Sequence, residues 1–178
     1  MVNDVSRAYF YAKVKRSLFV ELPAEDDKAQ NGQARRLNVC LYGTRDAAKG
    51  WQETLTEHLR KIGFTRGTGH TAVFHHAERN IKTLVHGDDY FSAAHKRDLD
   101  WLEGELGKRY QIKTQRLNDK ECEVKILNRV VCKTTEGFEL EADPGLAELI
   151  VEQVLSPTAK TVGTPGVEAS ENHEEQVQ

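Results

Sequence analysis

Three aspartates stand in or beside apolar stretches of this sequence. Asp88 and Asp89 are adjacent in "LVHGDDYF" (84–91), and Asp4 precedes the aromatic-rich "VSRAYFYA". An unpaired carboxylate is costly to bury, and carboxylates held close together raise one another's pKa unless a cation neutralises them. If the strands that carry these residues pair, the three carboxylates converge. We then expect them to hold magnesium, which combines a few carboxylates with water and phosphate oxygens. Two such ions can activate a 3′-hydroxyl and stabilise a leaving pyrophosphate.

Other interpretations of the same stretch stay open. Aspartate is common in turns, so Asp88 and Asp89 can also form a simple polar hairpin tip. As local chemistry, "HGDD" (86–89) also fits a metal-dependent phosphodiesterase that uses His86 with both aspartates, although the further His and Asp motifs of such enzymes are absent. Zinc binding by the histidines of "HTAVFHH" (70–76) is disfavoured, because no cysteine lies at zinc-finger spacing from them.

The hydrophobic pattern predicts the strands that position the aspartates. A short helix or turn is expected after Asp4, and strands are expected at 17–23, 37–43, 71–76, 81–86, 110–115 and 122–134. The chain continues extended after the aspartates, so residues 81–94 form a hairpin with the Asp pair at its tip. The polar stretch 24–36 predicts a solvated loop.

Two amphipathic helices are predicted between these strands. Trp51, Leu55, Leu59 and Ile62 place one apolar stripe on a helix over 44–62, and a second helix is expected over 96–109. A further hairpin closes around Gly137. Asp143 and Pro144 then begin a helix that runs to about Leu155. This order predicts an α+β fold, in which an antiparallel sheet is backed by two helices.

The bulk composition is close to neutral. The 178 residues contain 25 Lys and Arg against 28 Asp and Glu, a net charge of −3. Four of the acids lie in 161–178, which has no Lys or Arg, and these residues are predicted to form a disordered acidic tail. Cys40, Cys122 and Cys132 show no CxxC spacing and are expected to be buried, reduced thiols of an intracellular protein. The sequence has no apolar run of membrane-spanning length and no signal peptide, so a soluble protein is expected.

Several segments together resemble the reverse transcriptase of copia-type LTR retrotransposons. "DVSRAYFYAKV" resembles the first palm motif of that family, "VCLYGTRDAAKGW" (39–51) the second, and "LVHGDDYF" the "YVDD" segment with its apolar continuation. "GFTRGTGHTAVFHH" is similar to the Gly-Phe segment between the last two. "VKILNRVVCKTTEGFELEADPGLAELIVEQVL" fits the strand, hairpin and helix that follow, and "KTVGTPG" resembles the connector toward ribonuclease H. These matches cover about 165 residues in the family's order.

The resemblance implies a role for specific residues. Its catalytic and metal-binding set is Asp4, Asp88 and Asp89, with the backbone carbonyl of Val5, and it implies two Mg²⁺ ions with Mn²⁺ as a possible substitute. Its nucleotide-binding set is Val5, Tyr9, Tyr42, Gly43 and Arg45, in which Tyr9 is the steric gate that selects deoxynucleotides. Core packing is the alternative role for Tyr9. Leu127 and Asn128, in "KILNRVV" (125–131), correspond to the primer grip. Lys108, Arg109, Lys113 and Arg116 are expected to form either a charge patch that follows the nucleic-acid backbone or simply a solvated surface.

The resemblance also implies a domain organisation and partners. Residues 1–134 correspond to the palm and 135–160 to a hairpin with a thumb-like helix. The implied partners are an RNA or DNA template-primer, deoxynucleotides, and the ribonuclease H and integrase domains of a polyprotein, with no membrane. The implied location is the cytoplasm, in a virus-like particle, or the nucleus. The sequence departs from the family pattern at His86 and Gly87 at the tip, at Asp46 in the second motif and at Asn128. The fingers that precede Asp4 in the family are not in this sequence. The two functions to be weighed are therefore an RNA-directed DNA polymerase and an inactive or domesticated remnant that binds nucleic acid weakly.

Overall fold

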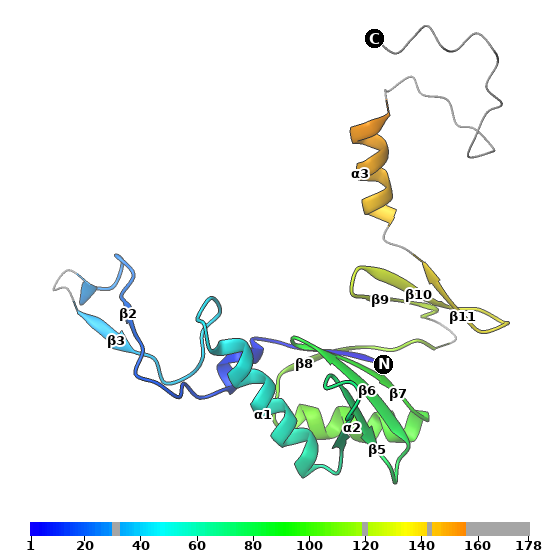
Figure 1. Cartoon of the computed structure of the whole chain (residues 1–178), viewed down its shortest axis with the longest axis horizontal. Coiled ribbons are helices and arrows are strands. Elements are labelled where there is room, and N and C mark those ends of the chain that lie inside the picture. The colour runs from blue at the N-terminus through cyan, green and yellow to red at the C-terminus, as the bar shows by residue number, and fades with distance from the viewer. Residues whose placement is uncertain (30–32, 119–120, 142–143, 156–178) are drawn as a thin grey trace, which may run out of the picture. The chain divides into compact units, whose positions relative to one another are not determined.

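The computed structural model describes residues 1–29, 33–118, 121–141 and 144–155 (Figure 1). Within these ranges the chain forms two compact units. The first runs from Met1 to Leu140 and contains the three aspartates. The second begins at Glu141 and contains helix α3 (Pro144–Val154). The predicted acidic tail and the predicted helix cap Asp143 lie outside the described residues.

A six-stranded sheet organises the first unit. Its strands lie in the order β4-β5-β6-β7-β1-β8, and each neighbouring pair is antiparallel. Their bounds are β1 (Val2–Val5), β4 (Thr65–Arg66), β5 (Val73–His76), β6 (Ile81–His86), β7 (Asp89–Ala93) and β8 (Ile112–Gln115). Because β1 is inserted between β7 and β8, the start of the chain lies beside residues that follow it by about 85 and 110 positions.

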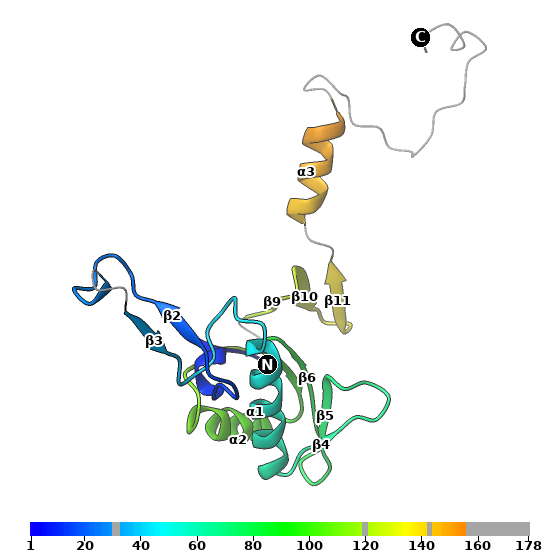
Figure 2. The same ribbon diagram turned by 60° about the vertical axis from the view of Figure 1, so that its left-hand side comes forward.

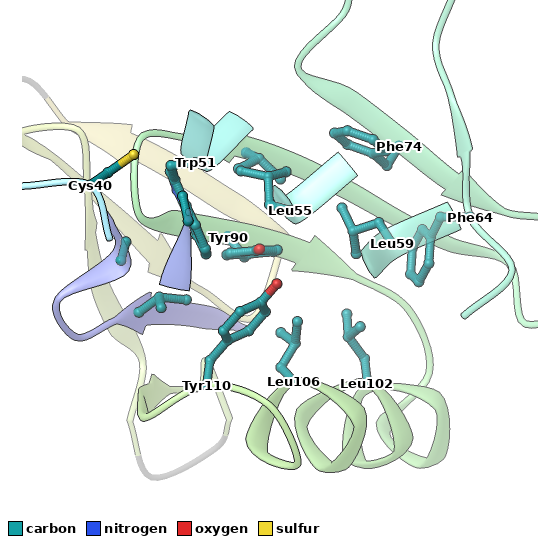
Figure 3. Close-up of a cluster of buried hydrophobic side chains, with 14 of the residues drawn as sticks. Cys40, Trp51, Leu55, Leu59, Phe64, Phe74, Tyr90, Leu102, Leu106 and Tyr110 are labelled. Atoms are coloured by element: carbon teal, nitrogen blue, oxygen red, sulfur yellow. The ribbon is translucent and has the colours of Figure 1, made fainter. Parts of the chain in front are cut away.

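Helices α1 (Ala47–Lys61) and α2 (Lys96–Gly107) pack against one face of this sheet (Figure 2). Leu55 and Leu59 of α1, Leu102 and Leu106 of α2 and Tyr90 of β7 all belong to one buried cluster (Figure 3). Alternate residues of a strand point to opposite faces. Burial of Tyr90 against the helices therefore directs its neighbour Asp89 to the other face, which α1 and α2 do not cover.

Two smaller sheets complete the described part of the chain. Strands β2 (Phe19–Glu21) and β3 (Ala34–Arg36) form one antiparallel pair, and β9 (Glu123–Ile126), β10 (Arg129–Lys133) and β11 (Phe138–Glu141) form a three-stranded sheet in the order β11-β10-β9. The short 3₁₀ helix η1 (Ala8–Tyr11) follows β1. No helix among the described residues is both long and apolar enough to cross a membrane.

The structure confirms the α+β class, the two sheet-backing helices and the hairpin around 81–94. In the hairpin, Gly87 and Asp88 form the turn and Asp89 already belongs to β7. The short helix after Asp4, the strands at 110–134 and the helix after Pro144 are confirmed with shifted ends, and 122–134 is two strands with a turn between them.

Three predictions were wrong. Residues 37–43 do not form a strand: Val39 makes an isolated bridge to Lys13, and the N–H of Cys40 bonds the carbonyl of Ala12, which turns the chain into the core. The predicted loop 24–36 ends in β3, because Ala34–Arg36 pairs with β2. Of the cysteines, Cys40 is buried, whereas Cys132 is half-buried and Cys122 is exposed, since Cys132 lies in β10 of the small sheet and Cys122 just before β9, away from the main core.

Candidate active site

The strand register places Asp4 between an acid and a base. Asp4 lies directly opposite Asp89 on β7 and opposite Lys113 on β8. The flanking residues Asn3 and Val5 are fully buried toward the helices, so the Asp4 side chain points to the open face of the sheet, as does that of Asp89. Directly opposite residues of an antiparallel pair have neighbouring side chains. The sheet thus brings two of the three predicted carboxylates together on its open face.

Asp88 is held beside this pair by the backbone of the hairpin tip. The N–H of Val5 donates to the carbonyl oxygen of Asp88 at 3.0 Å, which ties the tip to β1. On the helix side, the indole N–H of Trp51 donates to the carbonyl oxygen of Gly87 at 2.7 Å. Gly87 has φ 62°, in the left-handed region that glycine adopts readily. Gly87, where the sequence departs from the family pattern, therefore provides the backbone turn that presents Asp88.

The electrostatics of Asp89 show that the three acids form one cluster. Burial raises the pKa of Asp89, and the negative charges of Asp88 and Asp4 raise it further, while His86 opposes them. Like charges at short range favour the neutral acid. A bound cation reverses this preference, so the cluster has the charge of a cation site.

The protein side chains alone do not complete a set of metal ligands. Among the described residues, no three His, Cys, Asp or Glu side chains are arranged as a group able to hold a metal ion on their own. Asp4 and Asp89 face each other and Asp88 adjoins them, which leaves room for oxygen ligands from water or phosphate. Magnesium is usually bound through one or two carboxylates together with waters and substrate phosphates. The residues present fit that kind of site.

A groove of about 590 Å³ connects the carboxylates with the β9–β10 hairpin. It is lined by Val2, Asp4, Asp89, Lys113, Gln115, Lys125, Leu127 and Asn128. The two residues predicted as the primer grip thus share one hollow with two of the predicted catalytic acids. The groove contains two lysines as well as two aspartates, so a polyanion and a cation can be accommodated side by side.

The turn of the β9–β10 hairpin is formed by Leu127 and Asn128, with φ values of 48° and 61°. Two consecutive residues at positive φ define a type I′ turn, which favours Asn and Gly. Asn128, a departure from the family pattern, suits this backbone. Leucine is unfavourable in this backbone conformation, and 47% of Leu127 is exposed. A strained apolar side chain on a turn beside a groove is a candidate contact for a ligand.

The residues predicted to bind nucleotide gather near the other side of the tip. The rings of Tyr9 and Tyr42 are stacked with centroids 4.3 Å apart. Burial and, next, the charge of Asp88 raise the pKa of Tyr42, which places Asp88 within electrostatic reach of this pair. Gly43 has φ 84°, and a Cβ added there would meet no atom within 4 Å. Arg45 is exposed just before α1. The side chain of Val5 is fully buried, so only its backbone faces Asp88.

Some groove residues were missed from the sequence. Gln115 and Lys125 were not predicted as site residues, and Lys113 was assigned only to a general charge patch. The alternation of "QIKTQ" (111–115) marks Lys113 and Gln115 as one face of a strand, and this signal could have placed them with Asp4. Asp46, the acid that departs from the family pattern in the second motif, forms an ion pair with Arg16, which neutralises its charge.

A family of known proteins and individual relatives both match this sequence. The sequence pattern of the family described as "Reverse transcriptase (RNA-dependent DNA polymerase)" matches residues 2–154. The Transposon Ty1-MR1 Gag-Pol polyprotein of Saccharomyces cerevisiae is 27% identical over 172 residues, covering 92% of this chain and 10% of the relative. The Truncated transposon Ty1-A Gag-Pol polyprotein of the same yeast is also 27% identical, and 14% of its length is covered. The chain thus spans about a tenth of the length of the curated relatives it matches.

Proposed function

Because the chain belongs to the reverse transcriptase (RNA-dependent DNA polymerase) family, we propose that it carries the nucleotidyl-transfer centre of an RNA-directed DNA polymerase from a copia-type retrotransposon. The observation that best supports this proposal is the register of β1 with β7. It sets Asp4 against Asp89 on the open face of the sheet, with Asp88 one residue away at the hairpin tip.

In this proposal Asp4, Asp88 and Asp89 would hold two Mg²⁺ ions, for which Mn²⁺ could substitute, and the backbone carbonyl of Val5 would be a further ligand. The ions would supply charge neutralisation for an in-line displacement in which a primer 3′-hydroxyl attacks a deoxynucleotide and pyrophosphate leaves. Lys113, directly opposite Asp4, offsets the negative charge of the acids and attracts phosphate. Leu127 and Asn128 contact the primer end from the far side of the groove. Tyr9 and Tyr42 flank the nucleotide, and Gly43 and Arg45 lie beside it.

The organisation around this centre is also proposed. Residues 1–134 act as the palm, and 135–160 as a hairpin with a thumb-like helix. The template-primer and deoxynucleotides are the substrates, and further domains of a Gag-Pol polyprotein, including ribonuclease H and integrase, are the partners. We further propose that the chain works in the cytoplasm, in a virus-like particle, or in the nucleus.

The proposal is tested first by metal binding to the chain itself. Mn²⁺ titrated into the protein should show a bound fraction by electron paramagnetic resonance, with Mg²⁺ as competitor. Asp89→Asn should weaken binding at least about tenfold, because it removes one of the facing ligands. Glu78→Gln is the matched control, since Glu78 is an exposed acid in the turn between β5 and β6 and its loss changes the net charge equally. Equal binding by wild type and Asp89→Asn would refute the metal site.

Catalysis is tested separately, by primer extension with this chain and with a polyprotein that contains it. Asp88→Ala and Asp4→Asn should abolish extension in whichever form is active, and Glu78→Gln should not. A chain that binds Mn²⁺ through Asp89 but extends no primer in either form would instead be the fold-retaining remnant. Extension that survives Asp88→Ala would contradict the assignment of the catalytic acids.

A further inference from the structure

A histidine lies in the same row of the main sheet as the proposed metal-binding acids. His86 is the last residue of β6, and the register sets it directly opposite Asp89 of β7. Asp89 in turn lies opposite Asp4 of β1, and Asp4 lies opposite Lys113 of β8. One line across four neighbouring strands therefore carries a base, two acids and a second base.

The side chain of His86 points to the open face of the sheet. In β6, Ile81, Thr83 and Val85 are buried on the side of the helices, whereas His86 is exposed. Alternate residues of a strand face opposite sides, so His86 shares the open face with Asp89. Directly opposite residues of an antiparallel pair have neighbouring side chains. The imidazole and the carboxyl are thus neighbours on one surface.

The spacing of these two residues is fixed by the backbone between them. His86 and Asp89 flank the turn 87–88 of the β6–β7 hairpin. The indole N–H of Trp51 donates to the first carbonyl of this turn, and the N–H of Val5 donates to the second. A ligand that contacts both side chains therefore meets a preorganised pair.

The imidazole lies near Asp89 and has no structural partner among the described residues. Burial, Asp88 and Asp4 raise the pKa of Asp89 and His86 lowers it, which places the ring within electrostatic reach of the carboxyl. In the part of the chain that the structure describes, the His86 side chain forms no hydrogen bond, ion pair or ring contact. An imidazole nitrogen is therefore available beside the acids.

We propose that His86 is a nitrogen ligand of a cation that Asp89 also binds, and that it makes the site select transition-metal ions over Mg²⁺. Imidazole suits the later divalent transition metals, whereas Mg²⁺ is bound by oxygen ligands. The carboxylate of Asp89 has two oxygens, so it can serve Asp4 on one side and His86 on the other. This inference rests on the proposed function, because it names the ion that the same acids prefer.

The competing role for His86 is that of a positive counter-charge to Asp89. Lys113 already offsets the acids at the other end of the row. The two roles differ in the sign of their effect on cation binding. A ligand strengthens the binding of its cation, whereas a counter-charge competes with the cation for the carboxylate. Removal of the imidazole therefore weakens metal binding in one case and strengthens it in the other.

The test is binding of Co²⁺ and of Mg²⁺ to the untagged protein, measured by calorimetry. In His86→Gln the Co²⁺ affinity should fall about tenfold while the Mg²⁺ affinity stays within about twofold, because the amide offers an oxygen but no imidazole nitrogen. His95→Gln is the matched control, since it changes an exposed histidine at the start of α2. It should leave both affinities as in the wild type.

A spectroscopic signature identifies the ligand directly. In the Co²⁺-loaded wild type, the ring protons of a coordinated imidazole should give hyperfine-shifted ¹H NMR resonances. These resonances should be absent from His86→Gln and present in His95→Gln. The proposal is overturned if His86→Gln keeps them or keeps the wild-type ratio of Co²⁺ to Mg²⁺ affinity. Tighter Co²⁺ binding by His86→Gln would also overturn it, because His86 would then be a counter-charge.

Asp89→Asn separates this inference from the proposed function. Loss of Co²⁺ affinity in both Asp89→Asn and His86→Gln is the result that the inference requires. If binding of both ions depends on Asp89 but the affinity ratio is unchanged in His86→Gln, the inference fails and the carboxylate site stands. If Asp89→Asn binds both ions as the wild type does, the proposed metal site fails and the inference fails with it.

Discussion

Asp89 is the residue whose charge state depends most clearly on its neighbours. Burial and the charges of Asp88 and Asp4 raise its pKa in the folded chain. A folded protein with a raised carboxyl pKa binds more protons than the unfolded chain, so its stability falls as the pH rises through that pKa. At neutral pH the metal-free protein therefore carries an ionised Asp89 at a cost in free energy, and a bound cation removes that cost.

The first prediction concerns this cost. In EDTA at neutral pH, Asp89→Asn should increase the free energy of unfolding by about 0.5–1 kcal/mol, because it removes one of three repelling charges. Millimolar Mg²⁺ should stabilise the wild type and leave the variant nearly unchanged. Urea unfolding in both buffers measures this, with Glu78→Gln as the control of equal charge. A variant less stable than wild type in EDTA would show that the acids do not repel one another.

His58 behaves in the opposite way, because it is a base held neutral in the core. It is 7% exposed, its ring packs edge-on against Tyr110 at 5.0 Å, and its Nδ1 has no hydrogen-bond partner among the described residues. Burial, with the charge of Arg109 as the next cause, lowers the pKa of His58 to about 4. The unfolded chain therefore binds a proton that the folded chain does not take up until the pH reaches about 4.

The second prediction follows from this difference. As the pH falls below the ordinary histidine pKa of about 6.5, stability should fall, and the contribution of His58 between pH 7 and pH 5 is about 2 kcal/mol. In His58→Phe the free energy of unfolding should lose that part of its pH dependence, because no group titrates there. His86→Gln, which changes an exposed histidine, should keep it. The same slope in His58→Phe and wild type would exclude His58 as the source.

At the scale of single elements, the hairpin β6–β7 is positioned by contacts on both of its sides. Trp51 of α1 and Val5 of β1 each bond a carbonyl of its turn. Trp51→Phe should keep an aromatic ring in the core but remove the hydrogen bond to the carbonyl of Gly87, a net loss of about 0.5–1.5 kcal/mol, to which the cavity left by the smaller ring adds. Chemical unfolding measures this third prediction. Trp101→Phe, at the partly buried Trp101 that faces Arg79, should cost less, since the interaction it weakens is worth about 0.5–1 kcal/mol.

Substitutions in the turn of the β9–β10 hairpin should affect ligand binding without lowering stability. Leu127 has φ 48°, a conformation that costs a non-glycine residue about 1–2 kcal/mol. The fourth prediction is that Leu127→Gly relieves this strain and does not lower the free energy of unfolding, while binding of a primer-template weakens because the exposed side chain is lost. Asn128→Gly, at the neighbouring position of the same turn, controls for backbone freedom. Loss of stability in Leu127→Gly would mean that this leucine is structural.

The elements that the sequence predicted well are those with a strong local signal. The stripe through Trp51, Leu55 and Leu59 and the hairpin through the Asp pair have clear periods, and both formed as expected. The prediction of a strand at 37–43 was wrong, because an apolar run does not by itself distinguish a strand from a buried irregular segment. The pairing of Asp4 with Asp89 depends on β1 inserting between β7 and β8, and no local pattern carries that information. The resemblance to a known family supplied it instead.

At the scale of the molecule, the main sheet divides the first unit into a closed and an open face. The closed face holds the helices, the aromatic core and His58, and its residues account for stability. The open face holds Asp4, Asp89 and Lys113 on three neighbouring strands, β1, β7 and the edge strand β8. This division leaves the acids on the face that the helices do not cover, while the core on the other face fixes their strands.

Helix α3, in the second unit, carries exposed apolar side chains. Its exposed apolar residues are more than half accessible, and among them are Leu146, Leu149, Ile150 and Val154. These four follow the spacing of one helical face. An exposed apolar stripe of this kind promotes association. The fifth prediction is therefore that the isolated chain associates as its concentration rises, and that Ile150→Lys/Val154→Lys makes it monomeric, as measured by sedimentation velocity.

The matched control for that variant is Glu148→Gln/Glu152→Gln, which shifts the net charge by the same amount on the same helix and leaves the apolar stripe intact. It should associate like the wild type, because the hydrophobic stripe rather than the charge drives association. Both variants should show the wild-type urea transition at a concentration where all are monomeric, since α3 lies outside the compact unit Met1–Leu140. A wild type that stays monomeric at every concentration, or a lysine variant that still associates, would locate the contact elsewhere.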